Sequence, residues 1–305
     1  MKEIPKNIPA SILARLRNQA VVIERPYAEV LQYFVMERFL YRLSRSAQME
    51  RFILKGALMF SAWRGPFARP TRDIDFQGRT GNDVDNIVAL IKSICVTIPD
   101  IQDGVEFLAE TVSGGPIMEG ADYEGVRVNV TARLGTARIP FHIDVGFGDP
   151  IAAGPVSVQL PTLLDFPAPV LRGYSREAVI AEKYHAMAHH GEINSRLKDF
   201  YDVWLLATKF EFEGKVLAQA IQATFRWRET ALDPAVVALS AEFAGDAARQ
   251  QSWTIFLKRA QIAGAPAAFG EVVEVLRVFL QPITQALIEG LGVEWRWSSG
   301  GPWRR

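Results

Sequence analysis

Two neighbouring stretches decide the fold: RFILKGALMFSAW at residues 51–63 and RDIDF at residues 72–76. In the first, an apolar run ends at Lys55-Gly56, and an apolar segment rich in helix-forming residues follows. In the second, Asp73 and Asp75 alternate with apolar residues, which is typical of a strand with one buried face. Residues two apart on a strand point to the same side, so the two carboxylates project together. Adjacent carboxylates repel each other, and a divalent cation with oxygen ligands usually relieves this repulsion.

A third candidate strand, residues 139–147, places apolar residues on one face and Asp144 on the other. A strand edge in contact with water would also explain an isolated Asp-x-Asp. The Lys-Gly turn before it and the acidic strand after it favour a metal site formed by Asp73, Asp75 and Asp144. Three such carboxylates suit phosphoryl or nucleotidyl transfer, in which Mg²⁺ or Mn²⁺ bridges phosphate oxygens of a nucleoside triphosphate.

The order of the predicted elements indicates an α+β protein. A mixed sheet flanked by helices, residues 1–160, should precede a helical domain, residues 161–305. Before the junction, the patterns predict helices at 8–20, 28–46, 57–63 and about 83–98, and strands at 52–54, 72–76, 105–112, 125–133 and 139–147. After it, they predict helices at 175–190, 196–208, 213–224, 234–243, 252–261 and 270–289. The Gly- and Ser-rich tail from Trp295 is expected to be mobile.

Composition places this 305-residue chain among globular proteins, with 49% hydrophobic and 22% charged residues. No apolar run approaches the roughly 20 residues of a membrane span. The first residues have no apolar signal-peptide core. A single cysteine, Cys95, excludes an internal disulfide. A cytoplasmic protein without a membrane partner is therefore expected.

Charge is distributed unevenly. Residues 1–80 hold 14 Lys and Arg against 7 Asp and Glu, whereas residues 81–170 hold 4 against 12. On the helix predicted at 28–46, Arg38, Arg42 and Arg45 share one stripe. This stripe is either a solvated surface or, together with Arg64 and Arg69, a binding surface for RNA phosphates.

No phosphate-binding loop of the Gly-x-x-x-x-Gly-Lys-[Ser/Thr] type and no kinase signature occurs in the sequence. Nucleotide phosphates must therefore be held by a short turn and by basic side chains. The turn would comprise Lys55, Gly56 and Ala57, and the candidate cations are Arg72 and, from the helical part, Lys183.

The motifs resemble the AbiEii-type nucleotidyltransferase toxins of the DNA-polymerase-β-like nucleotidyltransferase superfamily. The matching segments are Leu54-Lys-Gly-Ala, Arg69-Pro-Thr-Arg-Asp-Ile-Asp, the strand with Asp144, Glu182-Lys183 and Lys198-Asp-Phe-Tyr-Asp-Val-Trp. The resemblance implies a nucleotidyltransferase fold followed by a helical domain. It also implies the toxin of a bacterial toxin–antitoxin or abortive-infection (phage-defence) pair, with an antitoxin as a partner. Some family members add nucleotides to the 3′ end of tRNA.

Carried over by position, the resemblance makes Asp73 and Asp75 the metal-binding carboxylates and Lys183 a contact to the nucleotide phosphates. Asp199 or Asp202 would be the late catalytic acidic residue. One position departs from the pattern, because Gly56-Ala57 stands where the superfamily usually has Gly-Ser or Gly-Gly. Backbone N–H groups at the start of the following helix could still bind phosphate.

Three functions agree with these features. The first is a metal-dependent nucleotidyltransferase toxin acting on RNA, with the 3′ end of tRNA as the main expected acceptor. The excess of basic residues in 1–80 favours this function. The second is transfer to a protein or small-molecule hydroxyl, and the third is an inactive relative that only binds a partner. The acidic and basic residues at Asp73, Asp75, Lys183, Asp199 and Asp202 argue against the third.

Overall fold

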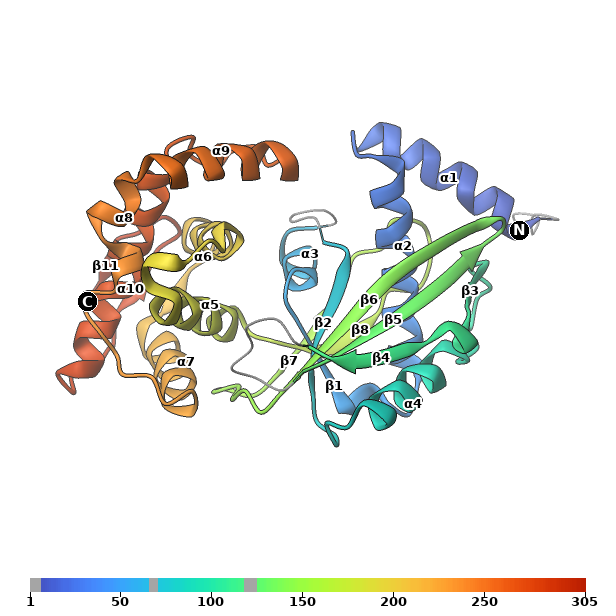
Figure 1. Ribbon diagram of the computed structural model, residues 1–305, viewed down its shortest axis with the longest axis horizontal. Helices are drawn as coiled ribbons and strands as arrows, with labels where there is room; N and C mark the ends of the chain where they lie inside the picture. Colours follow the sequence, from blue (N-terminus) through green and yellow to red (C-terminus); the bar gives the residue numbers. More distant parts are fainter. Residues whose placement is uncertain (1–6, 66–70, 118–124) are drawn as a thin grey trace. The chain divides into compact units, whose positions relative to one another are not determined.

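The computed structural model describes residues 7–65, 71–117 and 125–305, and its helices and strands are shown in Figure 1. The chain forms two compact units. The first comprises the residues up to Gly148 together with Pro155–Tyr174, and the second comprises Asp149–Gly154 and Ser175–Arg305. The predicted division at residue 160 differs from this one, because a later strand, β8 (Val170–Gly173), still pairs within the first unit.

The first unit is built on a mixed sheet with the strand order β3-β5-β6-β2-β1-β8-β7, and β4 also pairs with β5. β2 runs parallel to β6 and β1 runs parallel to β8, whereas the other neighbours are antiparallel. The fold is therefore α+β, as predicted. The strand bounds are β1 Phe52–Lys55, β2 Asp73–Gly78, β3 Val105–Phe107, β4 Ser113–Pro116, β5 Gly125–Leu134, β6 Ala137–Phe147, β7 Val156–Gln159 and β8 Val170–Gly173.

The sheet has one apolar and one polar face near its centre. Ile74 and Phe76 of β2 are fully buried, and Ile143 and Val145 of β6 are buried beside them. These residues join a core with α1 (Ile8–Val22), α2 (Tyr27–Arg45) and α4 (Val84–Cys95). The alternate residues of the same strands point to the opposite face, so the acidic side chains are kept out of the core. α3 (Leu58–Arg64) follows the turn after β1.

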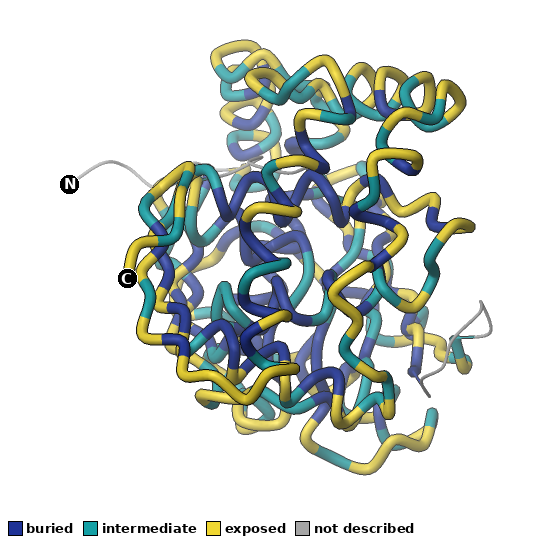
Figure 2. The backbone as a smooth tube through the Cα atoms, turned by 90° about the vertical axis from the view of Figure 1, so that its left-hand side faces the viewer, coloured by how far each residue is buried: buried dark blue, intermediate teal, exposed yellow. Residues whose placement is uncertain are grey.

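α2 is buried along most of its length. Its residues from Val30 to Leu43 are buried with few exceptions. Figure 2 shows the buried parts of the chain in dark blue. A helix with polar residues on several faces usually keeps some of them in water. α2 instead buries three charged residues, Glu37, Arg38 and Arg42.

The second unit is mainly helical. Ser175 accepts a hydrogen bond from the backbone N–H of Ala178 and so caps the first helix of this unit. Gly191 follows the last residue of that helix with a positive φ of 48°. The helices are α5 Arg176–His190, α6 Leu197–Lys209, α7 Gly214–Trp227, α8 Ala241–Gly245, α9 Ala247–Ala260 and α10 Phe269–Ile288.

The C-terminal tail is ordered, which corrects the prediction that it is mobile. β10 (Arg296–Trp297) pairs with β9 (Phe212–Glu213) and with β11 (Trp303–Arg304). The indole of Trp297 is buried and donates to the carbonyl oxygen of Ala207, and that of Trp303 donates to the carbonyl oxygen of Phe279. Trp297 and Trp303 therefore pack on α6 and α10.

Some predicted elements differ in extent. The strand expected at 105–112 ends at Phe107 and is followed by a 3-10 turn, Ala109–Thr111. The helix expected at 234–243 is replaced by a 3-10 turn, Val237–Leu239, and the short α8. α9 begins five residues earlier than residue 252. Among the described residues, none of the helices combines the length and the hydropathy that a membrane crossing requires.

Candidate metal and nucleotide site

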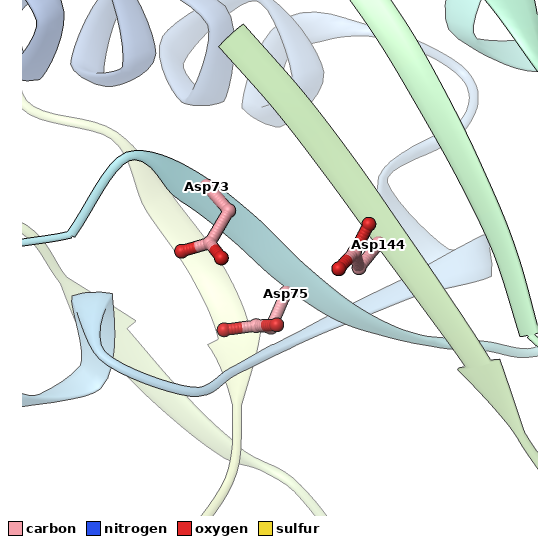
Figure 3. Close-up of side chains that lie close together, drawn as sticks. All are labelled: Asp73, Asp75 and Asp144. Atoms are coloured by element: carbon pink, nitrogen blue, oxygen red, sulfur yellow. The ribbon is translucent and has the colours of Figure 1, made fainter. Parts of the chain in front are cut away.

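Asp73, Asp75 and Asp144 converge on the polar face of the sheet (Figure 3). β2 and β6 are parallel and in register, so Asp75 lies opposite Asp144, and Asp73 lies opposite His142. One carboxylate oxygen from each aspartate lies within 4.8 Å of the others, and all three residues are partly exposed. Asp75 and Asp144 are cross-strand neighbours, and Asp73 lies two residues before Asp75 on the same strand. Three negative charges thus lie within a few ångströms of one another.

This group of oxygen ligands matches the preference of a hard divalent cation. Mg²⁺ and Mn²⁺ are bound by carboxylate oxygens, and ligands on opposite sides of such an ion are separated by about 4–5 Å. Partial exposure leaves room for water or a phosphate oxygen to complete the coordination. The geometry agrees with the metal site predicted from the alternation of residues in the two strands.

Arg127 is a member of this site that the sequence reasoning missed. Its Nε and one terminal nitrogen each donate a hydrogen bond of 2.8 Å to Asp144, one to each carboxylate oxygen. A signal for this pair exists in the sequence. Gly135 and its neighbour form a two-residue connection between β5 and β6, and counting back from Leu134 opposite Ala137 brings Arg127 opposite Asp144.

The turn after β1 supports the position of Asp75. Gly56 has a φ of 69°, and a Cβ atom at this residue would overlap the carboxylate of Asp75. Lys55 lies opposite Asp75 in the strand register. Its ammonium nitrogen is 5.6 Å from the ring centre of Tyr174, whose hydroxyl donates to Gln77. The turn therefore brings a cation to the edge of the acidic cluster.

Other predicted nucleotide-binding residues lie around the same strand ends. Ala57 is buried and directly precedes α3, so its side chain packs inside. Arg72 is exposed next to Asp73. The hydroxyl of Thr71 donates to the carboxylate of Asp73 and orients it.

Lys183, Asp199 and Asp202 form a second group, which belongs to the helical unit. The ammonium nitrogen of Lys183 lies 2.6 Å from Asp199 and 2.8 Å from Asp202, and both carboxylates are buried. Arg196 adds a contact of 2.7 Å to Asp199. Burial by itself would raise the pKa of the Asp199 carboxyl, but the charges of Lys183 and then Arg196 lower it to about 2. The structure thus brings together the three residues predicted from the helical part, as an ion-paired cluster.

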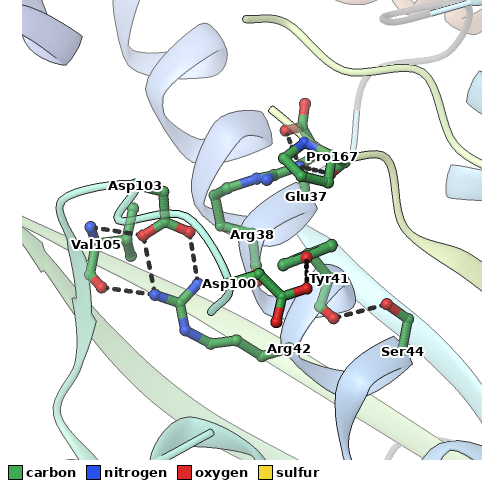
Figure 4. A network of polar contacts seen from close by, with 9 residues as sticks. All are labelled: Glu37, Arg38, Tyr41, Arg42, Ser44, Asp100, Asp103, Val105 and Pro167. Atoms are coloured by element: carbon green, nitrogen blue, oxygen red, sulfur yellow. Dashed lines mark hydrogen bonds and ion pairs between the residues drawn. The ribbon is translucent and has the colours of Figure 1, made fainter. Parts of the chain in front are cut away.

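Two of the three arginines in the predicted stripe on α2 are buried, so the stripe does not form a continuous surface. Arg42 donates hydrogen bonds of 2.8 and 2.9 Å to Asp103, and Arg38 lies 2.6 Å from Glu37 (Figure 4). The exposed fractions of Arg38 and Arg42 are 1% and 3%, so neither can contact RNA phosphates in this fold. The prediction for these two residues is corrected.

The other residues predicted to contact RNA differ from these two in exposure. Arg45 is exposed and lies 3.3 Å from Asp100, and Arg64 is exposed at the end of α3. Arg69 lies outside the described residues. The basic surface available to an anionic partner is therefore smaller than the charge count of residues 1–80 suggested.

The first unit thus combines a mixed sheet, a Lys-Gly turn and three clustered carboxylates, which is an arrangement suited to nucleotidyl transfer. A sequence profile of the nucleotidyl transferase AbiEii toxin family of type IV toxin–antitoxin systems matches residues 38–275. The chain belongs to this family, which confirms the resemblance drawn from its motifs.

Two solved structures resemble the fold. One is a protein of Helicobacter pylori described as a nucleotidyltransferase, with 16% identity, 87% of this chain and 98% of that chain covered, and a TM-score of 0.47. The other is JHP933 of Helicobacter pylori, with 15% identity, 86% and 94% covered, and a TM-score of 0.48. No curated protein sequence matches the chain.

Proposed function

We propose that this chain transfers nucleotides from a nucleoside triphosphate to the 3′ end of an RNA, with tRNA as the principal acceptor. The observation that carries the chemistry is the convergence of Asp73, Asp75 and Asp144 within 4.8 Å on one sheet face. Membership of the AbiEii family supports the reaction class and the role of a toxin with a cognate antitoxin.

In this proposal, Asp73, Asp75 and Asp144 hold Mg²⁺ or Mn²⁺. When bound, the metal supplies charge stabilisation for the phosphates and lowers the pKa of the attacking hydroxyl. Thr71 orients Asp73, and Gly56 leaves the space in which the Asp75 carboxylate lies. Lys55, Arg72 and the backbone N–H groups at the start of α3 bind phosphate oxygens.

For the helical unit taken by itself, membership of the family supports phosphate binding by Lys183 and a catalytic role for Asp199 or Asp202. The Lys183 side chain is 15% exposed and is paired with the two aspartates. Asp199 retains its negative charge at neutral pH because Lys183 and Arg196 lower the pKa of its carboxyl. One of the two aspartates would then fix the lysine, and the other would act as the late catalytic acidic residue.

The choice of RNA rests on the family and on exposed basic residues of the first unit. Arg45, Arg64 and Arg72 are exposed in the first unit. RNA phosphates are bound mainly by such side chains, and the binding should weaken as salt increases. In the cell, this activity would make the protein a growth-arresting toxin in the cytoplasm, used in abortive infection or phage defence.

Labelling of purified tRNA tests the proposal. The protein is incubated with tRNA, Mg²⁺ and each of four α-labelled nucleoside triphosphates, and the RNA is then separated by size. We expect label at the tRNA 3′ end with the wild type and none with Asp75→Asn. Label that enters a protein or a small molecule instead would replace the RNA acceptor by the second candidate function. Absence of transfer to any acceptor would favour an inactive binding protein.

A further inference from the structure

A row of alternating charges crosses the polar face of the sheet. Arg127 of β5 lies opposite Asp144 of β6, Asp144 lies opposite Asp75 of β2, and Asp75 lies opposite Lys55 of β1. The two carboxylates occupy the centre of the row, and one cation lies at each end. The proposed metal ligands are therefore flanked on the sheet itself by positive side chains.

The two cations are held differently. The ammonium group of Lys55 lies beside the ring of the buried Tyr174 and above Gly146, where a Cβ atom would be 3.6 Å away. Arg127 has an exposed side-chain fraction of 47% and reaches Asp144 from the open side. Arg127 can therefore change its partner without disturbing the core, whereas Lys55 is half-buried beside Tyr174.

The bond between Arg127 and Asp144 conflicts with full occupation of the metal site. The guanidinium already satisfies both oxygens of Asp144, at 2.8 Å each. A divalent cation held by the same carboxylate would lie within a few ångströms of this positive charge, and like charges at that distance repel strongly. Binding of the metal should therefore weaken or displace the guanidinium.

A displaced Arg127 would remain next to the metal, where its guanidinium could bind another anion in place of Asp144. The planar fork of a guanidinium matches two oxygens of a phosphate as well as two oxygens of a carboxylate. A nucleoside triphosphate brings such oxygens to the metal. Asp144 thus holds Arg127 before the substrate arrives. A phosphate group of the nucleotide can then replace Asp144 as the partner of Arg127.

We propose that Arg127 is an exchangeable counter-ion, which neutralises Asp144 in the metal-free protein and binds a phosphate group of the nucleotide when a divalent cation is present. This inference rests on the proposed metal-dependent transfer. Arg127 would then have two opposite effects, because it weakens binding of the metal and strengthens binding of the phosphate.

The first measurement is direct binding of Mn²⁺ to the full-length protein, followed by the paramagnetic signal of the free ion. Arg127→Gln should bind Mn²⁺ about tenfold more tightly than the wild type, because one competing positive charge is removed. Arg127→Lys, which keeps the charge, should stay close to the wild type. Arg133→Gln is the matched control, since Arg133 lies on the same strand and is paired with Glu106 at a comparable exposure.

The second measurement is binding of inorganic tripolyphosphate, the part common to all nucleoside triphosphates, at saturating Mn²⁺. Arg127→Gln should weaken this binding about tenfold, the effect of losing one charged phosphate contact, and Arg133→Gln should leave it unchanged. Thermal unfolding of each variant verifies that the fold is kept.

The outcomes separate this inference from the function on which it rests. Equal or weaker Mn²⁺ binding by Arg127→Gln would overturn the competition and make Arg127 a group that orients Asp144. Unchanged tripolyphosphate binding would overturn the exchange. Failure of the wild type and all variants to bind Mn²⁺ would overturn the proposed metal centre and the role of Arg127 together.

Discussion

The position of the Asp75 carboxylate depends on the absence of a side chain at Gly56, and the substitution Gly56→Ala tests this dependence. A Cβ atom at residue 56 would overlap the Asp75 carboxylate, and a φ of 69° is unfavourable for alanine by about 1–2 kcal/mol. We expect Gly56→Ala to reduce transfer by about 100-fold or more, because a shift of about 1 Å in a catalytic group has effects of this size. Activity and urea unfolding would be measured on the same samples.

Gly115→Ala is the control for this prediction. Gly115 lies in β4, has open space where the added methyl group would lie, and does not have a positive φ. Its replacement should leave both measurements near the wild-type values. If Gly56→Ala kept full activity, the turn would not support the acidic site in the proposed way.

Glu37 gives the protein a predictable pH dependence. Burial raises the pKa of its carboxyl from 4.5 to about 7, against the opposing effect of Arg38. Between these values the folded protein keeps a proton that the unfolded chain has lost. The free energy of unfolding should therefore be highest below pH 4.5, as far as this group is concerned, and fall as the pH rises towards 7.

Glu37→Gln should remove this contribution, so that the variant loses less stability than the wild type between pH 5 and 7.5. Urea unfolding at several pH values measures the difference. Glu106→Gln, in an exposed pair with Arg133, should follow the wild-type curve. Parallel curves for the wild type and Glu37→Gln would show that Glu37 does not titrate in this range.

Among the elements, the strands were easier to predict than the faces of α2. Alternation of polar and apolar residues in β2 and β6 was sufficient to place Asp73, Asp75 and Asp144 on one side of the sheet. Helical spacing likewise predicted that Arg38, Arg42 and Arg45 share a stripe. It did not predict that this stripe is covered, because the covering partners, Asp103 and the loop at 163–167, are far away in the sequence.

Pairing by short strands was also hidden from the sequence pattern. β7 lies within residues 150–169, which are rich in Pro, Gly and Ala and favour a linker, and β8 follows directly after this segment. Each has only four residues and is defined by partners across the sheet. Local sequence carries little information about such contacts.

Arg42 and Arg45 both lie on α2, but Arg42 forms a buried ion pair with Asp103, so their substitutions should differ in their effect on stability. Arg42→Ala would leave a buried carboxylate without its main partner, which costs about 3–5 kcal/mol in the free energy of unfolding. Arg45→Ala removes an exposed pair with Asp100 and should cost at most about 1 kcal/mol. Urea unfolding of both variants measures the contrast. Equal losses would mean that the interior position of Arg42 is wrong.

For the whole molecule, substitutions of Lys183 test how the helical unit contributes to the reaction. Lys183 holds two buried carboxylates, so Lys183→Met should destabilise the protein by about 3–5 kcal/mol whatever its catalytic role. Lys183→Arg keeps the charge and separates the two functions. We expect it to retain most of the stability but to lose transfer activity, because a guanidinium does not reproduce the position of the ammonium group.

Measurements of KM for the nucleotide, kcat and urea unfolding on Lys183→Arg decide this point. A variant with wild-type kinetics would leave Lys183 as a structural link between α5 and α6. The family resemblance implied catalytic roles for Lys183, Asp199 and Asp202, and the spacing of three residues places the two aspartates on one helix face. Neither predicted that a single lysine binds both, which depends on how α5 and α6 pack.

The late position of β8 in the chain has a consequence for dissecting this protein. β8 pairs with β1, the strand that leads into the Lys-Gly turn. A fragment that ends at residue 160 would expose the backbone N–H and C=O groups of β1 along an open sheet edge. Such edges recruit strands from other molecules, so this fragment should aggregate. A fragment that extends through Tyr174 would keep that edge covered. If the protein is to be produced as two separate fragments that reassociate, the chain should therefore be divided after Tyr174.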